Sequence, residues 1–88
     1  MEITFDQNKN KLNIEKHGIS LADAQLLEWD TLWAIEDLRS NYQETRIIGY
    51  AYLGLRLMNV VYTDRDDTRR VISLRKANKR EVKKYANA

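Results

Sequence analysis

The sequence predicts a small α+β protein, and three features of its 88 residues support this class. Polar capping residues and one glycine, Gly18, bracket two short segments near the start, as expected for helices. From Leu32 onward, apolar residues recur with a period of two, as expected for strands. Asn78, followed three residues later by Glu81, is typical of a final helix start. We therefore expect two N-terminal helices, a mostly antiparallel four-stranded sheet with a possible short extra N-terminal strand, and one C-terminal helix, all in a single domain spanning residues 1–88.

The N-terminal third is expected to contain the short strand and both helices. Residues 1–5 alternate weakly and are a candidate edge strand. Asp6 is a favourable N-cap for a helix that runs to about His17, and a glycine follows directly, where it accepts a positive φ easily. A Ser-x-x-Asp pattern comes next and predicts a second helix over roughly Leu21–Glu28.

The central part of the chain is expected to form the sheet. β-Branched and aromatic residues are dense there, as strands favour. The alternating segments are residues 32–38, 47–53, 57–62 and 69–75. Gly54 marks one tight hairpin and the polar run 63–68 marks another. After the last strand, Asn78 is expected to cap a helix that reaches about Ala86.

Composition excludes several classes of function. The chain has no cysteine, which removes disulfides, thiolate metal sites and cysteine nucleophiles. His17 is the single histidine, so a metal site with several histidine ligands cannot form within one chain. The longest apolar stretch, around Leu53–Tyr62, is interrupted by polar residues and cannot span a bilayer. No secretory signal is visible at the N-terminus. We therefore expect a cytoplasmic protein without metal or cofactor and without membrane contact.

Charge is distributed unevenly along the chain. Residues 1–44 carry four basic and nine acidic side chains, whereas residues 45–88 carry eleven basic and four acidic ones. A segment of net charge −5 is thus followed by one of +7. Such asymmetry predicts an anionic partner for the C-terminal part. RNA, DNA, a membrane surface and an acidic protein all satisfy this charge, and so does a solvated basic face without any ligand.

The last predicted strand carries the first candidate for phosphate binding. Residues of equal parity share one face of a strand. The odd-numbered residues are therefore expected to point together, away from Ile72 and Leu74: Arg69, Val71, Ser73 and Arg75. A guanidinium at position 75 binds a phosphate through two parallel N–H bonds and stabilises charge on its oxygens. A salt bridge to Asp37 or Glu44 is the alternative role for this arginine.

His17 is the second candidate, because it lies at the expected end of the first helix. An unperturbed imidazole titrates near pH ~6.5, which suits general acid–base chemistry at a ribose hydroxyl or a leaving oxygen. A histidine at a helix C-terminus also interacts favourably with the helix dipole and the last carbonyls. The sequence therefore leaves a catalytic and a structural role open for this residue.

Several short patches, in one order and with compatible spacing, resemble a known family over nearly the whole chain. The most specific are Lys-His-Gly at 16–18 and Ile-Ser-x-Arg-x-Ala at 72–77. The other matching positions include Asp6, Asn13, Asp37, Glu44, Arg46, Gly49, Glu81 and Tyr85. Together these patches resemble the BrnT family of type II toxin–antitoxin ribonuclease toxins. Phe5 and Thr31 stand where the family usually has Trp and Pro, and neither change removes a functional side chain.

The resemblance implies a RelE-like fold, RNA cleavage that inhibits translation, and neutralisation by a cognate BrnA-like antitoxin. Operator DNA is then contacted only through the antitoxin. Cleavage of RNA without a metal requires the ribose 2′-OH to attack the adjacent phosphate. That reaction needs a proton acceptor, a proton donor, and cations that stabilise the transition state.

The family and the residues together suggest a role for each candidate. Arg70 and Arg75 are expected to stabilise the phosphate. Glu44 or His17 is expected to transfer protons, and Arg46 to position Glu44. RNA binding is assigned to the basic residues Lys76, Lys79, Arg80, Lys83 and Lys84. Because Arg70 and Arg75 differ in parity, only a β-bulge or a strong twist brings them together.

Two other functions are consistent with the same basic residues. A non-catalytic nucleic-acid-binding protein predicts salt-sensitive RNA binding without any product. A protein-interaction domain predicts that the C-terminal basic strip docks an acidic protein. Product formation separates the ribonuclease from the first alternative, and co-expression with the neighbouring gene separates it from the second.

Overall fold

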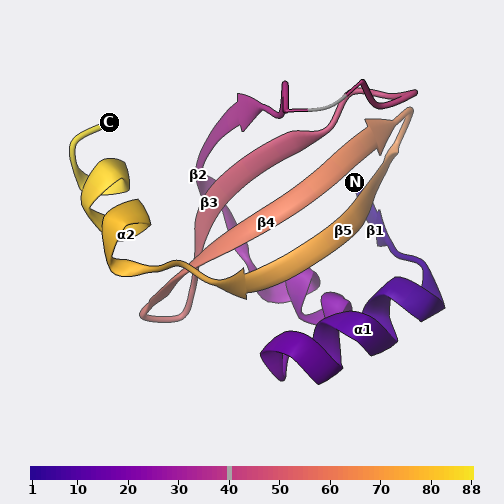
Figure 1. Ribbon diagram of the computed structural model, residues 1–88, viewed down its shortest axis with the longest axis horizontal. Helices are drawn as coiled ribbons and strands as arrows, with labels where there is room; N and C mark the ends of the chain where they lie inside the picture. The colour runs from indigo at the N-terminus through magenta and orange to yellow at the C-terminus, as the bar shows by residue number, and fades with distance from the viewer. Residues whose placement is uncertain (40) are drawn as a thin grey trace.

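The computed structural model describes residues 1–39 and 41–88. Its elements are β1 (Glu2–Thr4), α1 (Gln7–His17), the 3₁₀ helix η1 (Leu21–Leu26), β2 (Glu28–Glu36), β3 (Ile47–Leu53), β4 (Arg56–Arg65), β5 (Thr68–Lys76) and α2 (Lys79–Ala86). Figure 1 shows a strongly twisted sheet, with α1 and α2 at opposite ends of the molecule. Among the described residues, no helix is long and apolar enough to cross a membrane.

The sheet has five strands and mixed direction, in the order β1-β5-β4-β3-β2. Strands β2 to β5 form an antiparallel meander, and β1 adds to β5 in parallel, with Ile3 opposite Arg69. The prediction of two N-terminal helices with a four-stranded antiparallel sheet is therefore wrong. The pairing of β1 with β5 joins opposite ends of the chain, so no local pattern specifies it.

The segment after Ser20 also differs from the predicted second α-helix over Leu21–Glu28. It is a 3₁₀ helix that ends at Leu26, and the chain is already extended at Glu28. The carbonyl of Ala24 accepts from the N–H of Leu27, three residues on, and from the Trp29 indole N–H at 3.0 Å. In an α-helix the N–H of residue 28 would donate to this carbonyl. The Trp29 indole N–H donates to it instead, so the helix ends and the chain continues into β2.

The ends of α1 and α2 agree with the capping predictions. The Asp6 side chain accepts from the Lys9 backbone N–H at 3.0 Å, and Gly18 ends α1 with φ 69°. At α2, Asn78 and Glu81 form a reciprocal capping box. These helix ends form as predicted because each cap and its partner lie within a few residues of each other.

One face of the sheet, covered by α1 and η1, holds the main core. Fully buried Leu21 and Ala24 from η1 pack there against the sheet residues Ala51, Met58, Val60, Tyr62, Val71 and Leu74. The edge of β5 beyond β1 is closed by Asn13 of α1. Its side-chain amide donates to Leu74 O at 2.8 Å and its oxygen accepts from Leu74 N at 3.2 Å. Asn13 thus continues the hydrogen bonding that a longer β1 would have made.

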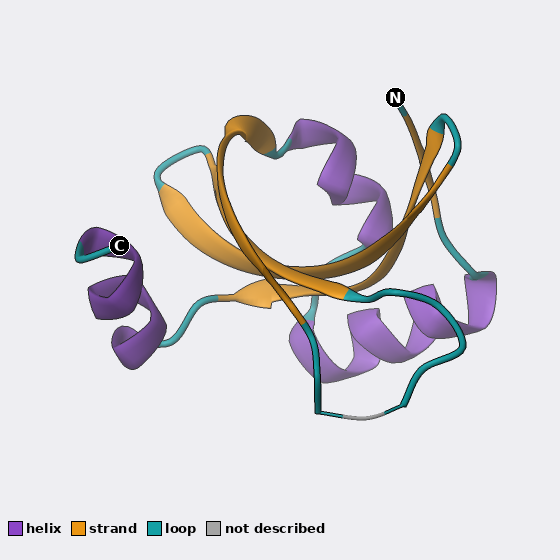
Figure 2. Ribbon diagram, turned by 90° about the horizontal axis from the view of Figure 1, so that it is seen from above, coloured by secondary structure: helices purple, strands orange, loops and turns teal. Residues whose placement is uncertain are grey.

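Helix α2 lies beside one end of the opposite face of the sheet, as Figure 2 shows, and Tyr50, Leu57 and Asn59 are buried on that face. The Tyr85 ring packs edge-on against Tyr52, and its hydroxyl donates to Thr31 O at 2.6 Å. Lys84 lies over the Trp33 ring at 5.7 Å. These side chains hold α2 beside this face of the sheet, which is called the open face below because α1 and η1 pack on the other face.

Candidate functional site

A β-bulge in β5 determines which arginines share the open face. Val61 pairs with Ser73 while its neighbour Tyr62 pairs with Val71, so Ile72 is the extra, unpaired residue. An extra residue inverts the alternation of side chains beyond it. The open face therefore carries the residues opposite Thr63, Val61 and Asn59, which are Arg70, Ser73 and Arg75.

The bulge corrects the expectation that Arg69, Val71, Ser73 and Arg75 point together. Val71 is fully buried in the core on the other face. Arg69 lies there too, between the rings of Trp29 at 4.6 Å and Tyr62 at 4.2 Å, and it forms a bidentate pair with Asp64. A hollow of about 760 Å³ adjoins Arg69 at the β1 edge, on the face of the sheet opposite to Arg75.

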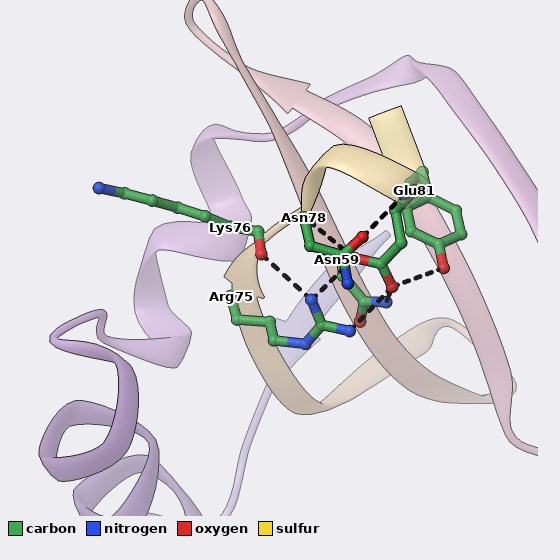
Figure 3. Close-up of polar contacts among 6 residues, drawn as sticks. Asn59, Arg75, Lys76, Asn78 and Glu81 are labelled. Atoms are coloured by element: carbon green, nitrogen blue, oxygen red, sulfur yellow. Dashed lines mark hydrogen bonds and ion pairs between the residues drawn. The ribbon is translucent and has the colours of Figure 1, made fainter. Parts of the chain in front are cut away.

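Arg75 is held in a fixed orientation by the C-terminal helix. Its Nη1 donates to Glu81 Oε1 at 2.8 Å and its Nη2 to Glu81 Oε2 at 2.9 Å (Figure 3). Nη1 also donates to the Lys76 carbonyl at 3.1 Å. Two parallel bonds to one carboxylate fix both the position and the plane of the guanidinium. Neither Asp37 nor Glu44, the predicted alternatives, is the partner.

Glu81 is the centre of this cluster. Besides Arg75, its carboxylate accepts from the Tyr50 hydroxyl at 3.1 Å and from Asn59 Nδ2 at 3.3 Å. The Arg75 guanidinium is the main cause that lowers the pKa of Glu81 to about 2, so the carboxylate stays ionised at neutral pH. Burial and the neighbouring carboxylate raise the pKa of Tyr50, which therefore remains a hydrogen-bond donor.

A second arginine, missed by the sequence analysis, reaches the same place from the loop after β2. Arg39 Nε and Nη2 donate to Asp37 Oδ1 and Oδ2 at 2.8 and 2.9 Å. The Asp37 side chain is only 1% exposed, and its hydrogen bonds from Arg39 are the main cause that lowers its pKa. A hollow of about 240 Å³ lies between the loop, the sheet and α2; its lining is Arg39, Ile48, Tyr50, Asn59, Val61, Ser73, Arg75 and Glu81.

Arg75 and Arg39 bind their carboxylate partners through different N–H groups of the guanidinium. Glu81 occupies the Nη1/Nη2 end of Arg75, which leaves Nε–H and one Nη2–H without an acceptor in the described part of the chain. Asp37 occupies the Nε/Nη2 edge of Arg39, which leaves the Nη1/Nη2 end. Each free edge matches two oxygens of a phosphate. The hollow is smaller than the roughly 300–1,000 Å³ of most small-molecule sites, and a phosphodiester group suits that size.

His17 lies at the C-terminal end of α1 and is half-buried. Burial lowers the pKa of its imidazole, and the positive charges of Lys16 and Arg75 lower it further. The imidazole is therefore mainly neutral at pH 7 and is able to accept a proton. The Arg75 charge is the smallest of these causes, and His17 is not among the residues that line the hollow between Arg39 and Arg75.

Glu44 and Arg46 lie apart from Arg75, at the other end of the open face. Glu44 accepts from Arg65 Nε at 2.8 Å rather than from Arg46. Arg46 lies over the Tyr42 ring at 4.2 Å, and its buried Nε has no hydrogen-bond partner among the described residues. These residues line a separate hollow of about 370 Å³. Arg70 is five residues from Arg75, a distance of roughly 15 Å along the strand.

The predicted RNA-binding residues all lie on or beside α2, and all are exposed: Lys76, Lys79, Arg80, Lys83 and Lys84. Within the described ranges, none of them forms an ion pair with a carboxylate. The Lys76 side chain points away from the Arg75 cluster, as Figure 3 shows. Residues 1–39 and 41–88 contain no group of three or more residues able to hold a metal ion.

Four members of the site went unassigned in the sequence analysis: Arg39, Tyr50, Asn59 and Glu81. Glu81 was recognised only as a helix cap, and its role as partner of Arg75 depends on how α2 docks. One available signal was that a residue with a polar group, Tyr50 or Asn59, stands among apolar neighbours in each of two strands. Polar residues at such positions require partners when the strands pair.

The fold and the site together define a small α+β protein whose sheet carries a cluster of arginines and their carboxylate partners on one face. The model of the family "Ribonuclease toxin, BrnT, of type II toxin-antitoxin system" matches residues 5–81. The chain therefore belongs to the BrnT family of ribonuclease toxins of type II toxin–antitoxin systems, as its resemblance predicted.

A solved structure agrees with this assignment at the level of the fold. The chain is similar to the Brucella abortus ribonuclease toxin BrnT, known from a crystal structure at 1.1 Å resolution. The TM-score is 0.70 at 24% sequence identity, and the match covers 90% of this chain and 99% of the Brucella chain. No curated protein matches the sequence.

Proposed function

We propose that this chain is a metal-independent endoribonuclease whose scissile phosphate binds in the hollow between Arg39 and Arg75. The observation that carries this proposal is the fixed orientation of Arg75, whose Nε/Nη2 edge is left open by its pairing with Glu81. The free N–H groups of the two guanidiniums donate to the oxygens of a pentavalent phosphate, while Glu81 and Asp37 hold the guanidiniums in place. Lys76, Lys79, Arg80, Lys83 and Lys84 bind the flanking RNA backbone.

In the proposed reaction, the ribose 2′ oxygen attacks the adjacent phosphorus and the bond from phosphorus to the 5′ oxygen breaks. The 2′-OH proton goes to neutral His17, and the leaving 5′ oxygen takes a proton from water. The products are a 2′,3′-cyclic phosphate and a 5′-hydroxyl. His17 is preferred to Glu44 as the base because Glu44 is bound by Arg65 and lines a different hollow. Arg46 and Arg70 then contact neighbouring phosphates along the open face.

The proposed consequence is inhibition of translation in the cytoplasm, neutralised by a BrnA-like antitoxin that covers the basic strip. Operator DNA is reached only through that antitoxin. These statements rest on family membership and on the basic side chains of α2, which form no ion pair within residues 1–39 and 41–88. Co-expression with the neighbouring gene is expected to relieve the growth arrest that the toxin causes alone.

Incubation of purified protein with single-stranded RNA in excess EDTA is expected to yield fragments with 2′,3′-cyclic phosphate ends. A single-stranded DNA of the same sequence lacks the 2′-OH nucleophile and is expected to stay intact. Salt-sensitive RNA binding without cleavage would instead identify a non-catalytic RNA-binding protein. Cleavage that EDTA abolishes would contradict the metal-independent mechanism.

The pH dependence of cleavage tests His17 separately. Its folded pKa lies below 6.5, and the neutral form is the proton acceptor. kcat/KM is therefore expected to rise with pH while the imidazole loses its proton, with the midpoint of this rise below about pH 6.5. His17→Asn is expected to lower the plateau about 100-fold and to remove this rising limb. If His17→Asn keeps both the wild-type rate and the rise of kcat/KM with pH, His17 is excluded as the base.

A further inference from the structure

An apolar groove lies between α2 and the hairpin that joins β3 to β4. Its volume is about 590 Å³, and its lining is Tyr52, Leu53, Leu55, Arg56, Leu57 and Val82. The Leu55 side chain at the hairpin tip is fully exposed, at 104%, and Val82 of α2 is 45% exposed. The groove shares no lining residue with the proposed phosphate hollow.

The apolar residues of this groove are not explained by the fold. Leu55 follows Gly54 in a tight turn, where a polar residue would satisfy the backbone equally well. Val82 points to the groove, whereas Glu81 and Tyr85 of the same helix face the sheet. Single exposed apolar residues are normal, but a contiguous apolar hollow with an exposed leucine is typical of a binding surface.

Basic residues flank the groove: Arg56 lines it, and Lys79 and Lys83 neighbour its lining residue Val82 on α2. Arg56 follows Leu55 directly, and Lys79 and Lys83 lie three residues before and one residue after Val82 on α2. Lys79 and Lys83 are themselves four residues apart, so they share one side of the helix and repel each other. No carboxylate pairs with these three side chains within residues 1–39 and 41–88. A bound acidic group would remove this repulsion.

The apolar lining of the groove and the basic residues beside it together favour one kind of binding partner. A second copy of this chain is disfavoured as the occupant, because the basic residues beside the two grooves would face and repel each other. An RNA backbone that follows Lys79 and Lys83 on α2 would leave the apolar side chains of Leu55 and Val82 without a partner. A membrane surface would be anchored by little more than one leucine, which gives weak insertion. An amphipathic protein segment with acidic residues beside its apolar ones satisfies both features.

We propose that this groove binds an acidic amphipathic segment of a protein partner, the antitoxin that membership of a type II toxin family implies. The apolar side chains of the segment contact Leu55 and Val82, and its carboxylates face Arg56, Lys79 and Lys83. The proposal rests on the partner in the proposed function and not on RNA cleavage. A partner bound there contacts Val82 on one side of α2. Glu81, on the side of α2 that faces the sheet, positions Arg75.

The test uses the protein encoded by the neighbouring gene, purified together with this chain and then separated. Its affinity is measured by calorimetry for the wild type, for Leu55→Ser/Val82→Ser, and for Leu26→Ser as a matched control, because Leu26 is 68% exposed but distant on η1. The double variant is expected to lose at least tenfold in affinity, and the control less than twofold. Arg56→Glu is expected to weaken binding further and to reduce its salt dependence.

Equal affinity of the double variant and the wild type would overturn the proposal, as would the absence of any complex. It would also be overturned if Leu55 and Val82 instead controlled self-association in light scattering, or binding to phosphatidylserine vesicles. RNA cleavage by the double variant is expected to remain at the wild-type level, since neither residue lines the phosphate hollow. Loss of partner binding with cleavage absent in all proteins would support the groove and reject the ribonuclease mechanism.

Discussion

Replacing Arg75 with alanine is expected to reduce RNA cleavage about 100- to 1,000-fold, the usual effect of removing one donor that stabilises transition-state charge. Arg75→Lys is expected to lose nearly as much, because an ammonium keeps the charge but lacks the planar pair of N–H donors. The reduction should appear in kcat more than in KM, since the strand and α2 still bind the RNA backbone. Single-turnover cleavage of a labelled RNA measures both quantities.

Arg65→Ala is the matched control for this experiment. Arg65 is also a strand arginine with one carboxylate partner, Glu44, but it lines a different hollow. Removing Arg75 alone leaves the Glu81 carboxylate without its main partner, so Arg75→Ala/Glu81→Gln tests whether the loss reflects an unpaired charge. The proposed role of Arg75 fails if Arg75→Ala cleaves RNA within threefold of Arg65→Ala.

The largest effect on stability is expected at Asn13. Its buried amide binds Leu74 N, Leu74 O and Ile19 O, and no other residue of α1 closes this edge of β5. Asn13→Ala leaves these backbone groups without partners and is expected to cost about 3 kcal/mol of the free energy of unfolding. For a domain of this size, the corresponding fall in Tm is roughly 12–24 °C. Thermal and urea denaturation followed by circular dichroism measure both values.

The same substitution at Asn8 provides the control, because Asn8 lies on the same helix with its side chain exposed. Asn8→Ala is expected to change stability by less than about 0.5 kcal/mol. Asn13→Asp retains an acceptor for Leu74 N–H but loses both donated bonds, so it is expected to be as destabilising as alanine. A loss below 1 kcal/mol for Asn13→Ala would show that this edge of β5 is not closed by the asparagine.

Helix ends were predictable because capping is a local interaction. Asp6 and Gly18 lie at the two ends of α1, and Asn78 and Glu81 form the box that begins α2. Each of these contacts joins residues at most four positions apart, so the chain carries the whole motif in one short window. The same reasoning failed after Ser20, where the indole of Trp29, from the following strand, takes the carbonyl of Ala24.

The candidate site was predictable in its chemistry but not in its arrangement. The basic character of the C-terminal half followed from residue types, whereas the role of Arg75 at a phosphate stays a prediction. The partner of Arg75 did not follow, because Glu81 reaches it only when α2 folds back beside β5. Arg39 was also missed, since a loop of several residues carries it from the end of β2 over the hollow.

The sequence by itself determined the charge gradient, the helix caps, the absence of cysteine chemistry and the family, because each depends on residue types or on contacts within one turn. Only the tertiary structure decided that β1 joins β5 in parallel and that Ile72 bulges. That single extra residue places Arg70 and Arg75 on one face and turns Arg69 to the other. Strand register is set by the combined packing of distant segments, and a shift of one residue exchanges the two faces of a strand.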